Sequence, residues 1–223
     1  DLLELIQAAD YKWMLAALLM SVTTFVGAAM SLDGFVVEKL SAWRTFQAQL
    51  ASGFATLVSP PALGVVAVNT RYLQREGLPA AAAGATVAVS QFIAFFVHVG
   101  LMFLAAVAAG NAEDFHFDPP QAAVFGIVGL LFAIVVVLPL PAVRKFLYRQ
   151  ARPRLDEIVP RLVTVAGKPL KLTEGIGGML LLNLAFCVAL YASVRAFGGY
   201  GSFAAIAFVY LAGSTLGQAA PTP

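Results

Sequence analysis

Long apolar runs separated by short charged segments dominate the hydrophobic pattern of this 223-residue chain. The runs that contain no Asp, Glu, Lys or Arg are residues 13–32, 45–70, 77–112, 119–143, 175–194 and 196–223. A helix needs about 20 mainly apolar residues to cross roughly 30 Å of hydrocarbon, so each of these windows is long enough for one crossing. The windows lack the period-two alternation of membrane β-strands. The pattern therefore predicts an all-α, polytopic membrane protein with about six transmembrane or re-entrant helices.

Composition agrees with this prediction, because 60% of the residues are hydrophobic and only 12% are charged. The net charge of +2 does not indicate nucleic-acid binding, since the basic residues flank apolar windows. Cys187 is the only cysteine of the sequence, so no disulfide can form within it. Its position inside an apolar window favours the role of a small buried residue. We expect one transmembrane domain over residues 1–223 and no cofactor.

The distribution of Lys and Arg predicts the orientation in the membrane. Most of these residues fall in segments 1–12, 71–76 and 144–174, which would share one side if every window crossed. Because positively charged loops stay in the cytoplasm, this count places the N-terminus inside. The segment 144–174 mixes basic with apolar residues and is predicted to form cytoplasmic amphipathic helices. It could hold anionic headgroups, or it could serve only as a topology signal.

The second window contains two adjacent prolines, Pro60 and Pro61, which should break its helix near the middle. Broken backbone at membrane depth is tolerated only where protein or water surrounds it, and it marks substrate sites in many transporters. A simple kink is the alternative, and whether the window crosses or re-enters stays open. Asn69, Arg71 and Arg75 follow the break, and the guanidinium groups could hold a lipid phosphate or anchor the helix end.

Isolated polar residues inside the other windows form a second set of candidates. Gln91 and His98 are seven residues apart and share a helical face, and Asn183 and Tyr191 lie two turns apart. They could line a cavity, with His98 relaying protons, or they could make ordinary hydrogen bonds between helices. The motif formed by Gly213 and Gly217, and the Ala-rich start of the third window, predict close helix packing.

Several signatures of chemistry are absent from the sequence. The six windows hold no Asp or Glu, and the chain has no Cys/His set with metal spacing, no phosphate-binding loop and no nucleophile motif. We therefore predict no catalytic residue, no metal site and no enzymatic activity within this chain.

Three stretches carry a resemblance to a known family: residues 59–64, residues 69–75 and the terminal residues 219–223. Together they resemble the lysylphosphatidylglycerol synthase transmembrane-region family, also called flippase-like, especially its actinobacterial members. In that family the terminal Pro-Thr-Pro usually continues into a Gly-rich motif and a Glu, so we expect this chain to be a fragment. Many relatives have Glu directly after the glycine of the first motif, where this chain has Val65.

The resemblance implies a multi-pass protein of the bacterial inner membrane that moves a phospholipid, anionic or aminoacylated, between leaflets. The alternatives are the membrane part of a transferase that modifies lipids, and a non-transporting scaffold; a homo-oligomer is possible in each case. The residues expected to contact the lipid headgroup, from the resemblance and from the pattern, are Pro60, Pro61, Gly64, Asn69, Arg71, Arg75, Gln218, Pro221 and Pro223.

Overall fold

The computed structural model describes residues 9–59, 61–110 and 167–219. The helices in these ranges are α2 (Tyr11–Gly34), α3 (Ala42–Val58), α4 (Pro61–Arg75), α5 (Ala80–Gly110), α8 (Pro169–Ala196) and α9 (Phe203–Ala219). The predicted window 119–143, most of the basic segment 144–174, Pro60, Pro221 and Pro223 lie outside the described residues. The last residues of that basic segment belong to α8, which begins at Pro169.

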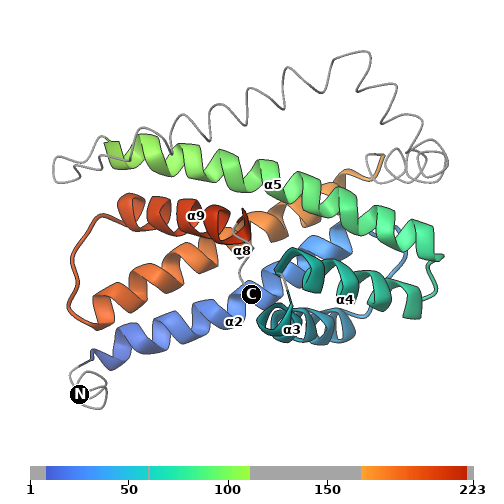
Figure 1. Cartoon of the computed structure of the whole chain (residues 1–223), viewed down its shortest axis with the longest axis horizontal. Helices are drawn as coiled ribbons and strands as arrows, with labels where there is room; N and C mark the ends of the chain where they lie inside the picture. Colours follow the sequence, from blue (N-terminus) through green and yellow to red (C-terminus); the bar gives the residue numbers. More distant parts are fainter. Residues whose placement is uncertain (1–8, 60, 111–166, 220–223) are drawn as a thin grey trace.

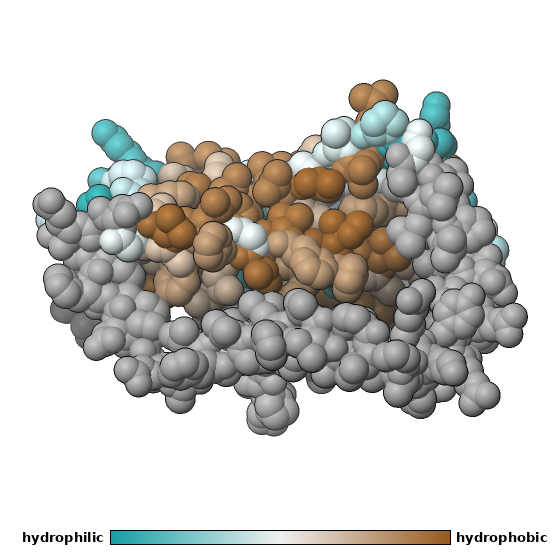
Figure 2. All heavy atoms as spheres, turned by 90° about the horizontal axis from the view of Figure 1, so that it is seen from above, coloured by the Kyte–Doolittle hydropathy of each residue, from teal (hydrophilic) through white to brown (hydrophobic). Residues whose placement is uncertain are grey.

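Among the described residues, α2, α5 and α8 are long and apolar enough to cross a membrane, with 24, 31 and 28 residues. The shorter α3, α4 and α9 have 17, 15 and 17 residues. At 1.5 Å per residue they reach only about 22–26 Å, less than the thickness of the hydrocarbon. Figure 2 shows an apolar middle between hydrophilic ends on the visible face. The chain is thus a multi-pass helical membrane protein, as predicted.

Helices α2 and α8 run antiparallel and touch along most of their length (Figure 1). The Asp10 amide donates to the Ala196 carbonyl oxygen at one end (2.9 Å), and Lys171 pairs with Asp33 at the other (2.7 Å). Glycines permit this contact, because a Cβ atom at Gly27 would lie 2.6 Å from the backbone nitrogen of Leu182.

Gly213 and Gly217, for which the sequence predicted close helix packing, do not pack closely in the way that the glycines of the α2–α8 contact do. A Cβ atom at Gly213 or Gly217 would meet no atom of the described chain within 4 Å, so the predicted packing there is wrong within the described residues. The Ala-rich start of α5 does pack as predicted, since Ala82, Ala83 and Ala85 are buried. Close packing therefore follows which helices the fold brings together, rather than the presence of a small-residue motif alone.

The second window does not cross the membrane as one helix. Helix α3 ends at Val58, Ser59 is extended (φ −144°, ψ 162°), and α4 begins at Pro61. The two helices lie antiparallel, because Thr45 near the start of α3 hydrogen-bonds Tyr72 near the end of α4 (2.8 Å). The chain thus enters and leaves on the same side, and the proline break forms the tip of a re-entrant hairpin (Figure 1).

This hairpin overturns the predicted grouping of the basic segments. A buried cluster joins Leu32 and Val36, at the end of α2, to Leu73 and Leu78, around the end of α4. Residues 71–76 therefore lie beside the C-terminal end of α2, at the opposite end from residues 9–12. The prediction that segments 1–12 and 71–76 share one side is wrong, because a window that re-enters reverses the side of everything after it.

The helices form two halves that run in opposite directions. In the first half α2 is followed by the α3–α4 hairpin, and in the second α8 is followed by the short α9 (Figure 1). Because α2 and α8 are antiparallel, the two short segments start from opposite ends of the bundle. Helix α9 packs against α5 and α8. This arrangement is consistent with the predicted pseudo-repeat halves.

Candidate functional site

Polar side chains hold the hairpin together from inside. Asn69 on α4 is buried, and its Oδ1 accepts hydrogen bonds from Gln49 Nε2 (3.0 Å) and Ser52 Oγ (3.4 Å) on α3. Each of these polar groups would be costly at membrane depth without a partner. Asn69, predicted to contact a headgroup, therefore fixes the register of the hairpin in this structure.

Gly64 also holds the hairpin closed. It is buried, and a Cβ atom there would lie 2.7 Å from Ser59 Oγ and 3.1 Å from the Ala55 carbonyl carbon. The absence of a side chain at Gly64 lets α4 start directly against the last turn of α3. We interpret Gly64 as a packing residue of the tip.

A groove of about 700 Å³ runs along the outer face of the hairpin, near its open end. Arg71 and Arg75 line it from α4, one helical turn apart, and Arg44 lines it from α3. Alanines make part of its floor, which keeps the groove open between the two helices. Its lining residues are Arg44, Gln47, Ala48, Ala51, Ala67, Val68, Arg71, Tyr72, Arg75 and Glu76.

Among the described residues, the guanidinium groups of Arg44 and Arg71 have only weak or uncharged partners. The Arg44 side chain is 68% exposed and contacts Glu76 at 3.5 Å, a weak pair at the surface. Arg71 donates to Gln74 Oε1 (3.2 Å), an amide that leaves the positive charge uncompensated. Three guanidinium groups facing one carboxylate suit an anion with several oxygens, such as a phosphate diester.

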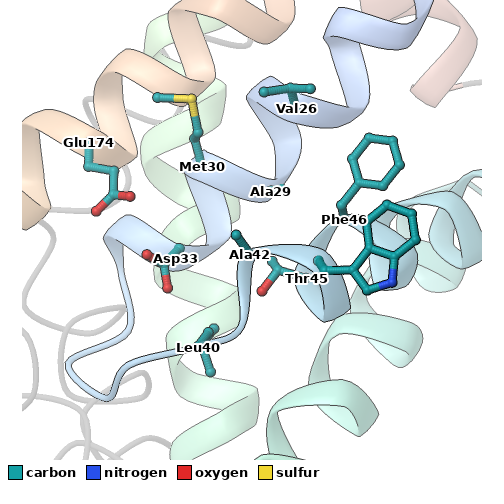
Figure 3. A pocket seen from close by; sticks show the side chains of 10 residues that line it. Val26, Ala29, Met30, Asp33, Leu40, Ala42, Thr45, Phe46 and Glu174 are labelled. Atoms are coloured by element: carbon teal, nitrogen blue, oxygen red, sulfur yellow. The ribbon is translucent and has the colours of Figure 1, made fainter.

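A second cavity of about 420 Å³ lies on the other side of α3, between α2 and the start of α8 (Figure 3). Its walls are mainly apolar, with Met30 and Phe46 among them, and two carboxylates, Asp33 and Glu174, face it. Lys171 contacts both acids, at 2.7 Å and 3.3 Å. Asp33 Oδ1 is buried and accepts no hydrogen bond from the described residues. The cavity thus carries acidic chemistry, unlike the groove.

His98 and Asn183, both predicted candidates, meet in the interior of the bundle. His98 Nδ1 lies 2.7 Å from Asn183 Oδ1 on α8, and its Nε2 lies 3.0 Å from the Leu211 carbonyl oxygen on α9. The hydroxyl groups of Thr215 and Ser214 approach Nε2 at 3.1 Å and 3.4 Å. The prediction of a hydrogen bond between helices is confirmed, and it joins three helices rather than two.

The remaining predicted residues lie apart from one another. Tyr191 accepts a hydrogen bond from Arg195 Nε (3.1 Å) in an aromatic cluster with Trp13, at the end of the bundle away from the arginine groove. Gln91 is exposed on α5. Pro61 begins α4, and Gln218 lies in the last turn of α9.

Sequence reasoning missed several residues of these sites. Arg44, Glu174 and Asp33 each lie directly next to a window without charged residues. Because the windows were defined by the absence of charge, these three residues were assigned to the connecting loops. Gln49 and Ser52 lie inside the second window, and their spacing of three residues placed them on one helical face. A hairpin interpretation of that window would have paired this face with Asn69.

The fold and these sites define a class: a polytopic helical membrane protein with a re-entrant hairpin and polar groups inside the bundle. Comparison with known families is more specific. The sequence model of the family described as the lysylphosphatidylglycerol synthase transmembrane region matches residues 1–223. The chain therefore belongs to that family. A search of curated proteins and a search of solved structures each give no match. The resemblance seen in the sequence is confirmed at the level of the family.

Proposed function

We propose that this protein translocates a phospholipid between leaflets and that the arginine groove, defined by Arg44, Arg71 and Arg75, receives the headgroup. The observation that carries the proposal is the position of this groove on a re-entrant hairpin. A charged headgroup cannot pass hydrocarbon alone, because burying it without polar partners costs several kcal/mol or more. A hairpin that starts at one end of the bundle and turns back part of the way along it offers a path along which lipid phosphate and protein polar groups can meet.

The chemistry of the groove favours an anionic group. Its arginines can bind phosphate oxygens bidentately, and the apolar faces of the alanines leave room for the glycerol backbone. An aminoacylated phospholipid carries an ammonium group in addition. In the second cavity the Asp33 and Glu174 carboxylates share one ammonium group, that of Lys171, so two acids face one base there. The proposal assigns no chemical step to this chain, only binding and movement of the lipid.

We further propose that the groove faces the cytoplasm of a bacterial cell. At this end of the bundle lie Lys39, Arg44, Arg71, Arg75, Lys168 and Lys171, whereas the other end has only Lys12 and Arg195 among the described residues. The positive-inside rule then puts the start of α2 outside, the reverse of the orientation expected from the sequence. The hairpin is the reason for the reversal.

Replacing Arg71 and Arg75 together by alanine is expected to slow lipid movement about tenfold or more, since each basic group attracts an anionic headgroup by about 1 kcal/mol. The measurement is the exchange rate of a fluorescent phosphatidylglycerol in vesicles that contain the full-length protein. The matched control is Lys39→Ala with Lys168→Ala, which removes two exposed charges at the same end outside the groove.

The control variant should keep the wild-type rate within about twofold, because surface charges outside the site act only through screened attraction. Equal rates for the wild type and the arginine variant would contradict the proposal. Equal slowing in both double variants would also contradict it, since the effect would then reflect total charge rather than the groove. Thermal unfolding in detergent establishes that all three proteins are folded.

A further inference from the structure

A third cavity, of about 240 Å³, lies at the end of the bundle opposite the arginine groove. The start of α2 and the end of α8 meet there, since the Asp10 amide donates to the Ala196 carbonyl oxygen (2.9 Å; Figure 1). The residues that line the cavity are Trp13, Tyr191, Arg195, Gly198, Gly199 and Tyr200. One basic side chain and three aromatic side chains therefore surround a small cavity at this end.

The Arg195 side chain is half-buried and held in place by the rings around it. Its Nε donates a hydrogen bond to the Tyr191 hydroxyl oxygen (3.1 Å). Its guanidinium carbon lies 5.2 Å from the centre of the Tyr191 ring and 5.8 Å from the centre of the Tyr200 ring, which is the range of cation–π contacts. Trp13 packs edge-on against Tyr191, with 5.9 Å between the ring centres. A ligand therefore meets a guanidinium group that is already ordered.

The turn after α8 leaves Arg195 without the usual role of a basic residue at a helix end, which is to donate to the last carbonyl groups. Gly198 adopts φ +74°, and its amide donates to the Arg195 carbonyl oxygen (3.1 Å). The Gly199 amide donates to the Val194 carbonyl oxygen (2.9 Å). Because backbone amides already serve these carbonyl groups, capping of α8 does not explain the position of the guanidinium group.

The positive charge of Arg195 has no acidic partner in the part of the chain that the structure describes. None of the ion pairs there includes Arg195. The Asp10 carboxylate, at the same end, accepts a hydrogen bond from the Lys12 amide (2.9 Å). The Arg195 Nη atoms and the Trp13 indole nitrogen form no hydrogen bond with other described residues. The cavity thus offers a guanidinium fork and a second donor, a combination that suits phosphate oxygens.

Arg195 lies at the depth of lipid headgroups. On α8 it is 24 residues from Lys171, so about 36 Å separates the two along the helix, more than the roughly 30 Å of hydrocarbon. Trp13 and Tyr200 are side chains of the kind that gather at the membrane interface. A phosphate that reaches this depth together with an apolar body is the phosphate of a phospholipid.

We propose that this cavity binds the phosphate of an anionic phospholipid in the leaflet opposite the arginine groove. The Arg195 guanidinium group contacts the phosphate oxygens, and the rings of Trp13 and Tyr200 flank the glycerol region. Simple anchoring of the helix end at the interface is the alternative, and it predicts no preference among lipids. In transport, the cavity and the groove would be the two ends of the lipid path. That use rests on the proposed function, whereas lipid binding at the cavity does not.

Trp13 reports on the cavity directly, because residues 1–223 contain two tryptophans and the other, Trp43, begins α3 at the opposite end. The test uses the full-length Trp43→Phe protein in vesicles, with probe lipids that carry a nitroxide quencher near the glycerol end. The Trp13 signal is the difference from a protein that also carries Trp13→Phe. We expect phosphatidylglycerol to bind about fivefold more tightly than phosphatidylcholine, whose ammonium group compensates its own phosphate.

Two variants separate the cavity from the general charge of this end. Arg195→Gln should abolish the preference for phosphatidylglycerol. Lys12→Gln removes an exposed charge at the same end outside the cavity and should keep the preference within about twofold. No preference in the wild type, an unchanged preference in Arg195→Gln or equal loss in both variants would overturn the inference. Thermal unfolding in detergent establishes that the variants are folded.

Two further measurements identify the source of the phosphate and the independence of the site. Inorganic phosphate, exchanged for chloride at constant ionic strength, should leave the quenching by phosphatidylglycerol unchanged; its removal would overturn the inference, because the cavity would then bind a free anion. Arg71→Ala with Arg75→Ala should also leave this quenching unchanged. The readout is lipid binding rather than lipid movement, so it can fail or succeed separately from the transport proposal.

Discussion

Replacing Gly178 by alanine is expected to destabilise the folded protein by about 2 kcal/mol or more, although it adds only one methyl group. A Cβ atom at Gly178 would lie 2.7 Å from the Gly27 carbonyl oxygen and 2.8 Å from the Met30 carbonyl carbon. These are backbone atoms of α2, so neither can move aside without separating the two helices. The α2–α8 contact ties together the two halves of the bundle, and its loss should lower the thermal unfolding temperature in detergent by several degrees.

Gly177 provides the matched control on the same helix. A Cβ atom there would meet no atom of the described chain within 4 Å. Alanine is the better helix former by about 1 kcal/mol, so Gly177→Ala should leave the unfolding temperature unchanged or raise it slightly. Equal unfolding temperatures for Gly178→Ala and Gly177→Ala would contradict the close packing of α2 on α8.

Replacing Lys171 by methionine is the second change with a large expected effect. Lys171 Nζ contacts Asp33 Oδ2 at 2.7 Å and the Asp33 carbonyl oxygen at 3.3 Å, at the end of the α2–α8 contact. Both side chains of the ion pair are 24% exposed. Removing the ammonium group leaves a mostly buried carboxylate whose Oδ1 already lacks a partner among the described residues. We expect a loss of about 2 kcal/mol, at the lower side of the range for buried pairs because some water reaches this one.

A second substitution separates lost pairing from lost packing. In the Lys171→Met protein, Asp33→Asn removes the uncompensated charge and should restore a substantial part of the unfolding temperature. The exposed Lys39 is the control, since Lys39→Met changes the same charge at the same end and should shift stability by less than about 0.5 kcal/mol. If Asp33→Asn worsened the Lys171→Met protein, the account of an unpaired carboxylate would be wrong.

The helical class of this protein could be predicted from sequence because it depends on local properties. Runs such as 13–32, 77–112 and 175–194 are apolar over a length that only a membrane helix explains, and each became a long helix. The break at Pro60 and Pro61 also follows from local chemistry, since proline restricts the residue before it and offers no amide donor. The prediction of the break and that of the three long helices are confirmed.

The direction that the chain takes after the break could not be predicted from local sequence properties. Residues 45–70 are long enough for one crossing, and the contact between Asn69 and Gln49 that decides for a hairpin becomes visible only once the two helices are paired. The orientation depended on this choice, because charge counting assigns sides by the number of crossings. One misjudged window therefore placed residues 71–76 on the wrong side relative to the start of α2.

The candidate sites divide in a similar way. His98 and Asn183 were found because an isolated polar residue in an apolar window needs a partner, but their pairing joins residues 85 positions apart. Arg71 and Arg75 were found from their spacing, whereas Arg44 joins them only through the fold of the hairpin. The substrate site expected at the proline break stays a prediction, because Pro60, Pro221 and Pro223 lie outside the described residues.

The central claim is that residues 42–75 enter and leave the membrane on one side, and labelling of single cysteines tests it most directly. In the full-length protein without its native cysteines, including Cys187→Ala, an exposed residue is replaced by cysteine at Lys39, Ala80 or Ser202. A membrane-impermeant maleimide is then applied to intact cells and to opened cells. We predict that positions 39 and 80 react alike, only after opening, and that position 202 reacts in intact cells. Labelling of positions 39 and 80 from opposite sides would contradict the re-entrant hairpin.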